Sequence, residues 1–486
     1  MKIRRIAALA LSLAILFAAL LIPAHAAPKA CGCGEVLQVW VDGFGQALFY
    51  GEGTPDEREA GMMVTDNIMD SVPALLLGGA MTLPSLSWDP LAGGISGVLY
   101  SLLGHLQLDE NGKSVEPIGS HWVIDEAQDH KTRPEFWFRY DFRLDPFELA
   151  AQLNDFIETL CKKTGHSKIA LTGHSEGTNV VMTYIKEYGT KRVETLILAN
   201  GGWQGLTLAG QLFTKQFALD GPAIANFIAN MLGTGYDPLT HAAMDLLRTS
   251  NLLWFAPLLG RGIKNTVMDP LFEQALVPLF CQMPAVWAFI PDEYFADALQ
   301  MLGDDPKYDG LKAKVSKFHY EVMNQSPALL KKAKAGGVKV AVIASYGNAP
   351  IPVTADSTYH SDRLIDSALE AGGATIAPYG QTLPPGSSKY RSPDGVIDAA
   401  TCAMPDQTWF VKYNWHNPDC LEELRQWIIH SKSYPSIHSN PDFPQYLRRA
   451  EDGRAIPLEG PDDPPPETFG QAVLGLGKAV WGQLLP

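Results

Sequence analysis

The stretch Lys168–Tyr188, KIALTGHSEGTNVVMTYIKEY, decides the fold of this chain of 486 residues. The apolar run at 168–172 contains β-branched residues and predicts a strand, and the apolar spacing from Val180 to Ile185 predicts a helix soon after it. Between them lies GHSEG at 173–177, the G-x-S-x-G pattern that places a serine on a sharp turn from strand to helix. Ser175 is therefore the candidate nucleophile, with N–H groups of the helix N-terminus placed to stabilise an oxyanion.

The elements on either side of this turn predict a sheet covered by helices. Strands are expected, in chain order, over Glu35–Asp42, Glu135–Tyr140, 168–172, Val193–Ala199, Val338–Ser345 and Thr408–Tyr413. A helix capped by Asp145, with Pro146 at its first position, connects the second of these strands to the third. Strand and helix in alternation are typical of a parallel sheet. The predicted fold class is α/β, and the nucleophile turn specifies the α/β-hydrolase fold: a mostly parallel sheet with helices on both faces.

Residues 201–336 interrupt this alternation. They are rich in apolar helical segments and aromatic residues, and no strand-length alternation occurs among them. Because the segment leaves the sheet one strand after Ser175, we expect an inserted helical cap that covers the serine. Trp203 is predicted to line the substrate site at the hinge of this cap. The hydrolase core is then predicted over 27–200 and 337–430.

The two ends of the chain differ from this core. A basic start, an apolar run over Ile6–Ile22 and an A-x-A sequence at 24–26 predict a signal peptide over 1–26, with an uncleaved membrane anchor as the alternative. The protein is thus expected to be secreted, either extracellular or associated with the cell envelope. Residues 431–486 are expected to form a separate tail, with an acidic Pro-rich linker at Pro457–Pro466 and a short amphipathic helix at Phe469–Leu485.

The charge of the chain bears on its partners. The formal net charge of −15 becomes −18 when the three basic residues of the predicted signal peptide are removed. This argues against nucleic acid and against attraction to anionic membrane surfaces. A neutral or apolar substrate fits better.

Two further blocks resemble a known family. YDFRL at Tyr140–Leu144 resembles the Y-D-[WF]-R-L block of the lecithin–cholesterol acyltransferase and lysosomal phospholipase A2 family, which there precedes a G-H-S-x-G turn at a similar distance. VDGFG at Val41–Gly45 resembles the oxyanion loop of that family, although it is shorter and has Asp42 where a proline is usual. The resemblance covers about residues 35–430 and implies lipid acyl esters as substrates. The oxyanion donors are then expected to be the N–H groups of Phe44 and Glu176.

The acid and the histidine of a triad follow the serine in this fold. SPDGV at Ser392–Val396 resembles the G-D-G-T-V segment that carries the catalytic aspartate of the family, so Asp394 is the first candidate and Asp398 the second. His416 comes within three residues of the last predicted strand. The other histidines after Ser175 lie in 201–336, before the proposed acid, or beyond a further predicted helix. The predicted triad is Ser175, Asp394 and His416.

Six cysteines permit disulfides in an exported protein. Cys402 and Cys420 are the favoured pair because they flank the segment from the candidate acid to the candidate histidine. Cys31-Gly32-Cys33 resembles half of a zinc knuckle, but no second pair of Cys or His at zinc-site spacing accompanies it. A structural role is expected for this pair, with no metal and no other cofactor.

These observations predict an exported serine ester hydrolase that acts on lipid acyl esters through an acyl-enzyme. The family resemblance also allows acyl transfer to an alcohol and transient contact with a lipid surface. A peptidase or a thioesterase on the same fold is one alternative. A catalytically idle hydrolase fold used for binding is another.

Overall fold

The computed structural model describes most of the chain between residues 31 and 460. The described residues are 31–51, 54, 56–60, 89–216, 218, 223–227, 242, 246, 272–354, 357–460, 473, 474 and 478. The predicted signal peptide lies outside them, as do most of 217–271 and most of the predicted terminal helix. Within the described ranges, no helix has the length and apolar character needed to cross a membrane.

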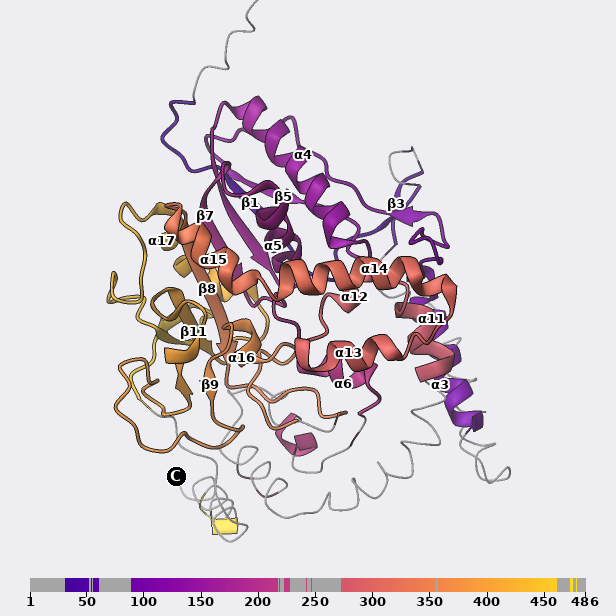
Figure 1. Cartoon of the computed structure of the whole chain (residues 1–486). Helices are drawn as coiled ribbons and strands as arrows, with labels where there is room; N and C mark the ends of the chain where they lie inside the picture. The colour runs from indigo at the N-terminus through magenta and orange to yellow at the C-terminus, as the bar shows by residue number, and fades with distance from the viewer. Residues whose placement is uncertain are drawn as a thin grey trace, which may run out of the picture.

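An eight-stranded sheet forms the centre of the molecule, in the order β13-β12-β11-β8-β7-β6-β1-β5 (Figure 1). Its strands are β1 Gln38–Val41, β5 Glu135–Phe138, β6 Ile169–His174, β7 Val193–Ala199, β8 Lys339–Tyr346, β11 Thr408–Lys412, β12 Tyr446–Arg449 and β13 Ala455–Pro457. Every neighbouring pair in this sheet is parallel except β12 and β13. The chain is therefore a mixed α/β protein with a mostly parallel sheet, as the sequence predicts.

Helices cover both faces of the sheet because successive strand residues point to opposite sides. Leu196 and Leu198 of β7 belong to a core cluster shared with α4 Pro146–Thr164, α5 Gly177–Tyr188 and α15 Ser326–Ala335. Ile197 and Ala199 belong to a second cluster, shared with α17 Glu422–His430. The central strands are thus apolar on both sides, which explains their continuous apolar runs.

Helix α4 begins and ends as the sequence predicts. The Asp145 carboxylate accepts a hydrogen bond from the Phe147 N–H at 3.0 Å, and Pro146 occupies the first turn. The helix ends at Gly165, whose φ of 75° is readily adopted by glycine. The next residues lead directly into β6, the strand that carries the nucleophile turn.

The described elements between 201 and 336 are all helical. They are α6 Thr207–Phe213, η4 Phe272–Leu276, α11 Val277–Phe280, α12 Pro284–Trp287, α13 Asp292–Gln300, η5 Pro306–Tyr308, α14 Asp309–Phe318, η6 His319–Met323 and α15. Helices α6 and α13 approach so closely that a Cβ at Gly210 would lie 2.2 Å from the Tyr294 ring. Trp287 and Phe295 are buried in a separate apolar cluster among these helices.

Short elements complete the described fold. They are β2 Phe49–Tyr50, β3 Arg58–Glu59, α3 Asp89–Leu103, η2 Gly104–Leu106, β4 Ile118–Gly119, α16 Ser367–Glu370, β9 Thr375–Ile376, β10 Ile397–Asp398, η7 Ala399–Thr401, η8 Pro405–Gln407 and η9 Pro418–Leu421. Strands β2, β3 and β4 form one small sheet, and β9 and β10 form another.

The predicted end of the core at residue 430 is too early. Strand β12 pairs in parallel with β11, with Val411 opposite Leu447, and β13 adds the last strand. Leu447 is fully buried in the cluster that includes α17. The strand was missed because YLRR is short and half basic, whereas pairing with β11 buries its apolar half.

Candidate active site

The turn between β6 and α5 holds Ser175 in a strained backbone conformation. Its φ of 55° lies in the left-handed region, which residues other than glycine rarely adopt. The flanking glycines are required by close packing, since a Cβ at Gly173 would lie 2.9 Å from the Gly177 carbonyl oxygen. A Cβ at Gly177 would lie 2.1 Å from the carbonyl oxygen of Val41. The strand, turn and helix predicted from the sequence are therefore present, with the serine at the apex.

The loop after β1 lies against the nucleophile. A Cβ at Gly43 would be 2.4 Å from Ser175 Cβ and 2.7 Å from its Oγ. Phe44 and Glu176, the predicted oxyanion donors, are the next residues on the two segments that meet here. No hydrogen bond recorded among the described residues uses the backbone N–H of either one. The side chain of Phe44 is turned toward Phe142, with ring centroids 4.4 Å apart.

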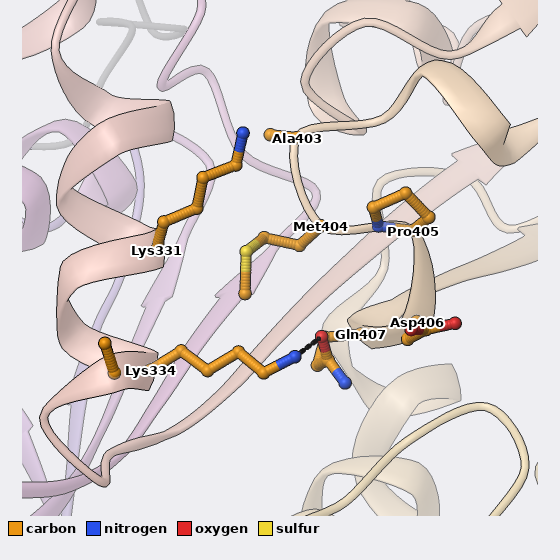
Figure 2. Close-up of a pocket in the computed structure, with 8 residues that line it drawn as sticks. Lys331, Lys334, Ala403, Met404, Pro405, Asp406 and Gln407 are labelled. Carbon is orange, nitrogen blue, oxygen red and sulfur yellow. Dashed lines mark hydrogen bonds between the residues drawn. The ribbon is translucent and has the colours of Figure 1, made fainter.

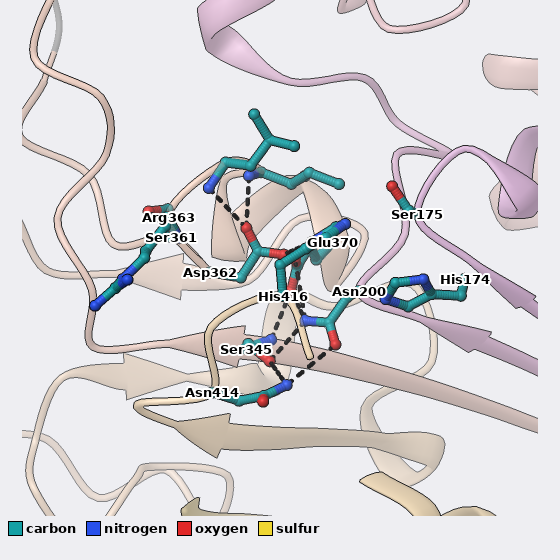
Figure 3. Close-up of polar contacts among 12 residues, drawn as sticks. His174, Ser175, Asn200, Ser345, Ser361, Asp362, Arg363, Glu370, Asn414 and His416 are labelled. Carbon is teal, nitrogen blue, oxygen red and sulfur yellow. Dashed lines mark hydrogen bonds and ion pairs between the residues drawn. The ribbon is translucent and has the colours of Figure 1, made fainter. Parts of the chain in front are cut away.

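His416 is hydrogen-bonded to Asp362, not to the predicted acid. Its Nδ1 donates to Asp362 Oδ2 in a short hydrogen bond (Figure 3). The other oxygen, Oδ1, accepts from the N–H groups of Leu364 and Ile365 at 2.9 and 2.7 Å. Asp362 is fully buried in the segment after β8, and His416 follows β11. These bonds fix both carboxylate oxygens and leave Nε2 of the imidazole as the basic nitrogen.

Ser175 lies on the far side of His416 from Asp362 in Figure 3. His174, which immediately precedes the nucleophile, has its ring centroid 4.9 Å from that of His416. Within the described part of the chain, the Ser175 hydroxyl has no hydrogen-bond partner.

Asp394 has a different set of partners. Its Oδ2 lies 3.1 Å from Lys412 Nζ and accepts a hydrogen bond from the Tyr346 hydroxyl at 3.0 Å. Its Oδ1 accepts from the Ser392 hydroxyl at 2.6 Å. Burial alone would raise the pKa of Asp394, but the Lys412 ammonium and these donors lower it below its usual value. The prediction that Asp394 pairs with the histidine is therefore wrong: Asp394 is a buried ion-pair partner of Lys412, and the carboxylate bonded to His416 is that of Asp362.

Asp398, the second candidate, also has a structural position. Its carboxylate accepts from the Ser388 hydroxyl at 2.8 Å and from the Ala400 N–H at 3.0 Å. It thereby caps the short helix η7.

A second carboxyl group, that of Glu370, stands behind Asp362. Burial and the Asp362 charge raise the pKa of Glu370 well above its usual value, so its carboxyl keeps a proton and donates it to Asp362. Glu370 Oε2 accepts from the Ser345 N–H at 2.5 Å. The Asn200 amide lies 3.4 Å from Oε1 and donates to the Ser345 hydroxyl at 2.6 Å. Glu370, which was not predicted from the sequence, is thus held by residues at the ends of β7 and β8 (Figure 3).

The charges of the pair favour an ionised acid and a more basic histidine. Burial opposes charge on Asp362, but His416 and the hydrogen bonds to its oxygens outweigh burial and lower the pKa of Asp362. Burial likewise tends to lower the pKa of His416, whereas the Asp362 carboxylate, with a smaller effect of Asp42, raises it above its ordinary value. The imidazolium that forms when His416 takes a proton is therefore stabilised.

A further histidine–carboxylate pair adjoins the site. His174 Nδ1 lies 3.0 Å from Asp42 Oδ1, and the His174 ring stacks on Trp40. Burial lowers the pKa of His174 despite its contact with Asp42. A neutral His174 beside His416 avoids a second positive charge in the site.

Glu176 is buried within the protein, with 1% of its surface exposed. Burial and the charge of Asp141 raise the pKa of Glu176 well above its usual value. A protonated Glu176 carries no negative charge that would oppose an oxyanion at the turn.

Trp203 does not line an open substrate site. It is 1% exposed, and its indole N–H donates to the Glu370 carbonyl oxygen at 3.0 Å. A Cβ at Gly372 would lie 2.5 Å from the Trp203 ring. The predicted substrate contact is corrected: Trp203 is a core residue that holds the segment carrying Glu370.

The predicted disulfide is also absent from the structure. Cys402 and Cys420 are both free and buried, and they belong to different apolar clusters. They flank the segment between Asp394 and His416 in the sequence, and this suggested a disulfide. The fold places them in different parts of the core.

The YDFRL block has a structural role beside the site. The Tyr140 hydroxyl donates to the Asp42 carbonyl oxygen at 2.6 Å and so holds the loop after β1. Asp141 binds Arg143 through both oxygens at 2.9 and 2.7 Å. The Arg143 guanidinium also donates to the carbonyl oxygens of Leu106 and Ile118, each at 3.1 Å. This fully buried arginine ties the excursion between β1 and β5 to the core.

Apolar side chains gather near Asp362 and the loop after β1. Phe289, Leu206, Leu208 and Ile365 form a buried cluster, with Phe44 packed against it. Ile365 is three residues from Asp362, and Phe44 adjoins Gly43 at the nucleophile. A Cβ at Gly202 would lie 2.5 Å from the Phe289 ring, so this wall is tightly packed.

A hollow of about 460 Å³ lies elsewhere, between α15 and the segment that follows β10 (Figure 2). Lys331, Lys334 and Met404 are among its lining residues, and Lys334 Nζ donates to Gln407 Oε1 at 2.6 Å. Ser175, Asp362 and His416 are not part of its lining. The hollow therefore belongs to a different region from the triad.

No protein-family model and no curated protein matches the chain. Among solved structures, it is similar to one described as "The crystal structure of Tle4-Tli4 complex", at 12% sequence identity and a TM-score of 0.25. The match covers 92% of this chain and 98% of that chain. A TM-score of this size carries no conclusion about fold or function.

Proposed function

We propose that the protein is a serine ester hydrolase with Ser175, His416 and Asp362 as its triad. The observation that carries the proposal is the bond from His416 Nδ1 to Asp362. The His416 ring lies 4.9 Å from that of His174, the residue before the serine at the left-handed strand-to-helix turn. Three such groups, in the chain order serine, acid, histidine, are typical of the α/β-hydrolase fold, which we propose for this sheet.

The mechanism follows from this arrangement. His416 Nε2 takes the proton of the Ser175 hydroxyl as its Oγ attacks the acyl carbonyl carbon. The N–H groups of Phe44 and Glu176 stabilise the negative oxygen, and His416 then returns the proton to the departing alcohol oxygen. A water molecule, activated by His416, attacks the acyl-enzyme and releases the acid. An alcohol in place of water would give acyl transfer.

Two features support a lipid acyl ester as the substrate. The cluster that includes Phe289 and Ile365 gives the site an apolar wall, which suits an acyl chain better than a charged group. The YDFRL block resembles the lecithin–cholesterol acyltransferase and lysosomal phospholipase A2 family, and it supports the loop that adjoins the nucleophile. Export of the enzyme and covering of the serine by residues 201–336 remain parts of this proposal, supported by the sequence pattern.

A fluorophosphonate probe tests the enzyme proposal directly. The wild-type protein is expected to be labelled on Ser175 and to hydrolyse p-nitrophenyl esters, whereas Ser175→Ala loses both labelling and turnover with an unchanged melting temperature. Hydrolysis that increases from short to long acyl chains supports the lipid assignment. An Ala variant that still labels, or a wild-type protein that never labels, contradicts the proposal.

A further inference from the structure

Four metal-binding side chains meet at the start of the described chain. Cys31, Cys33 and His130 place one ligand atom each within 4.8 Å of the other two. Cys31 Sγ lies 3.5 Å from His130 Nε2, and Cys33 Sγ lies 3.5 Å from His166 Nε2. The two imidazole rings are perpendicular, with centroids 5.4 Å apart. All four residues are partly buried.

The fold brings these residues together from three segments. The two cysteines precede β1, His130 lies in the loop before β5, and His166 lies between α4 and β6. Strand β1 pairs with both β5 and β6, so all three segments reach the sheet side by side. The Cys31 N–H donates to the Gly165 carbonyl oxygen at 2.9 Å, which anchors the cysteine segment beside His166.

Two distances in this cluster match those of a tetrahedral zinc site. Zinc binds thiolate sulfur and imidazole nitrogen at about 2.3 and 2.0 Å, so the sulfur and nitrogen ligands of one ion lie about 3.5 Å apart. The separations from Cys31 Sγ to His130 Nε2 and from Cys33 Sγ to His166 Nε2 both have that length. His166 approaches from the side of Cys33 and adds a fourth donor, giving two sulfur and two nitrogen donors, a set found in structural zinc sites.

We propose that Cys31, Cys33, His130 and His166 bind one Zn²⁺ ion. Four protein ligands leave no open position for water, so the ion is structural: it fixes the segment before β1 to the entries of β5 and β6. No metal was predicted from the sequence, because no Cys or His pair stands at zinc-site spacing from Cys31 and Cys33. The histidines stand 99 and 133 residues from their partner cysteines, and only the pairing of the strands brings them together.

The full-length protein, produced with a tag that contains no histidine, tests this site. Metal analysis after purification without chelators is expected to find about one zinc ion per chain in the wild type. Cys33→Ser and His130→Ala should each lower the bound zinc at least about tenfold. Cys161→Ala and His438→Ala change a cysteine and a histidine outside the cluster and should retain the ion.

Two measurements use the wild-type protein alone, so they do not require any variant to fold. Removal of zinc with a chelator should lower the melting temperature, and added Zn²⁺ should restore it. Co²⁺ bound in place of zinc should show thiolate-to-cobalt charge-transfer absorption, which a site without cysteine cannot produce. A reduced protein that binds no zinc, variants that bind as much as the wild type, or a Cys31–Cys33 disulfide detected as a peptide lighter by two hydrogens would overturn the proposal.

Discussion

At the scale of single residues, we expect Asp362 and Asp394 to differ in role. In the proposed mechanism Asp362 supports catalysis, whereas Asp394 supports the stability of the fold. Asp362→Asn should lower kcat by about 10⁴-fold because the amide favours the wrong imidazole tautomer. Asp394→Asn should leave the turnover of folded molecules close to that of the wild type. It should instead reduce the free energy of unfolding by about 3–5 kcal/mol, because it removes the negative charge that faces the buried Lys412 ammonium. Steady-state kinetics and thermal unfolding of both variants measure these effects, and the reverse pattern would restore Asp394 as the acid.

The pH dependence of activity follows from the raised pKa of His416. Only the neutral imidazole can accept the Ser175 proton, so kcat/KM should fall as the pH drops through that pKa. Because the Asp362 carboxylate raises this pKa above the ordinary histidine value of 6.5, the midpoint of the acid limb should lie above pH 6.5. A pH profile of kcat/KM on a non-ionising ester measures it. A midpoint below 6.5 would show that burial outweighs Asp362.

In the proposed mechanism, Glu370 acts through Asp362 as a positioning residue. Glu370→Ala removes the proton that it donates to Asp362 and should lower kcat/KM by about 10- to 100-fold. Glu370→Gln keeps a donor at that position and should recover most of the loss. The acid limb of the pH profile should move in the Ala variant and stay near the wild type in the Gln variant. Equal losses in the two variants would mean that the residue serves packing alone.

The sequence located some of these residues and not others for physical reasons. Ser175 lies in a local pattern, and His416 lies just after a strand, so both could be predicted. Asp362 has no distinctive neighbours in sequence, and its role arises from the Leu364 and Ile365 N–H groups and from His416, 54 residues away. Asp394 matched a familiar segment, but its side chain meets Lys412.

At the scale of elements, we expect the contact between the loop after β1 and the turn that carries Ser175 to affect the proposed activity. Gly43→Ala would place a methyl group within van der Waals overlap of Ser175, so one of the two segments must shift. A displacement of this kind should lower kcat/KM by about a hundredfold. Gly310→Ala in α14 is the control, because a Cβ there has no neighbour within 4 Å. It should leave activity unchanged and alter the free energy of unfolding by at most about 1 kcal/mol. Equal activity in the two variants would contradict this geometry.

Element boundaries were predictable where the local signal is strong. Asp145 and Pro146 mark the start of α4, and β7 has the predicted bounds of Val193–Ala199. Strands β12 and β13 depend on pairing at the sheet edge, which a short sequence window does not show. For the same reason, a short sequence window does not show that His130 and His166 lie near Cys31 and Cys33.

At the scale of the whole molecule, the sheet needs its last two strands. A chain that ends after Gly460 should fold and react with the fluorophosphonate probe. A chain that ends after Ser431 loses β12 and β13, exposing the edge of β11 and the apolar surface that buries Leu447. We expect that shorter chain to aggregate or to melt at a much lower temperature, as measured by circular dichroism. Equal melting temperatures for the two chains would mean that these strands contribute nothing to the core.

The protonated acids Glu176 and Glu370 and the proposed base His416 respond to pH in opposite ways. The folded chain holds protons on both that the unfolded chain releases near the ordinary glutamate value of 4.5, so their contribution favours folding most in acid and weakens as the pH rises. His416, in contrast, must lose its proton before it can act. In the hydrolase proposed above, these two acids would therefore stabilise the fold least at the pH where His416 is free to act as a base.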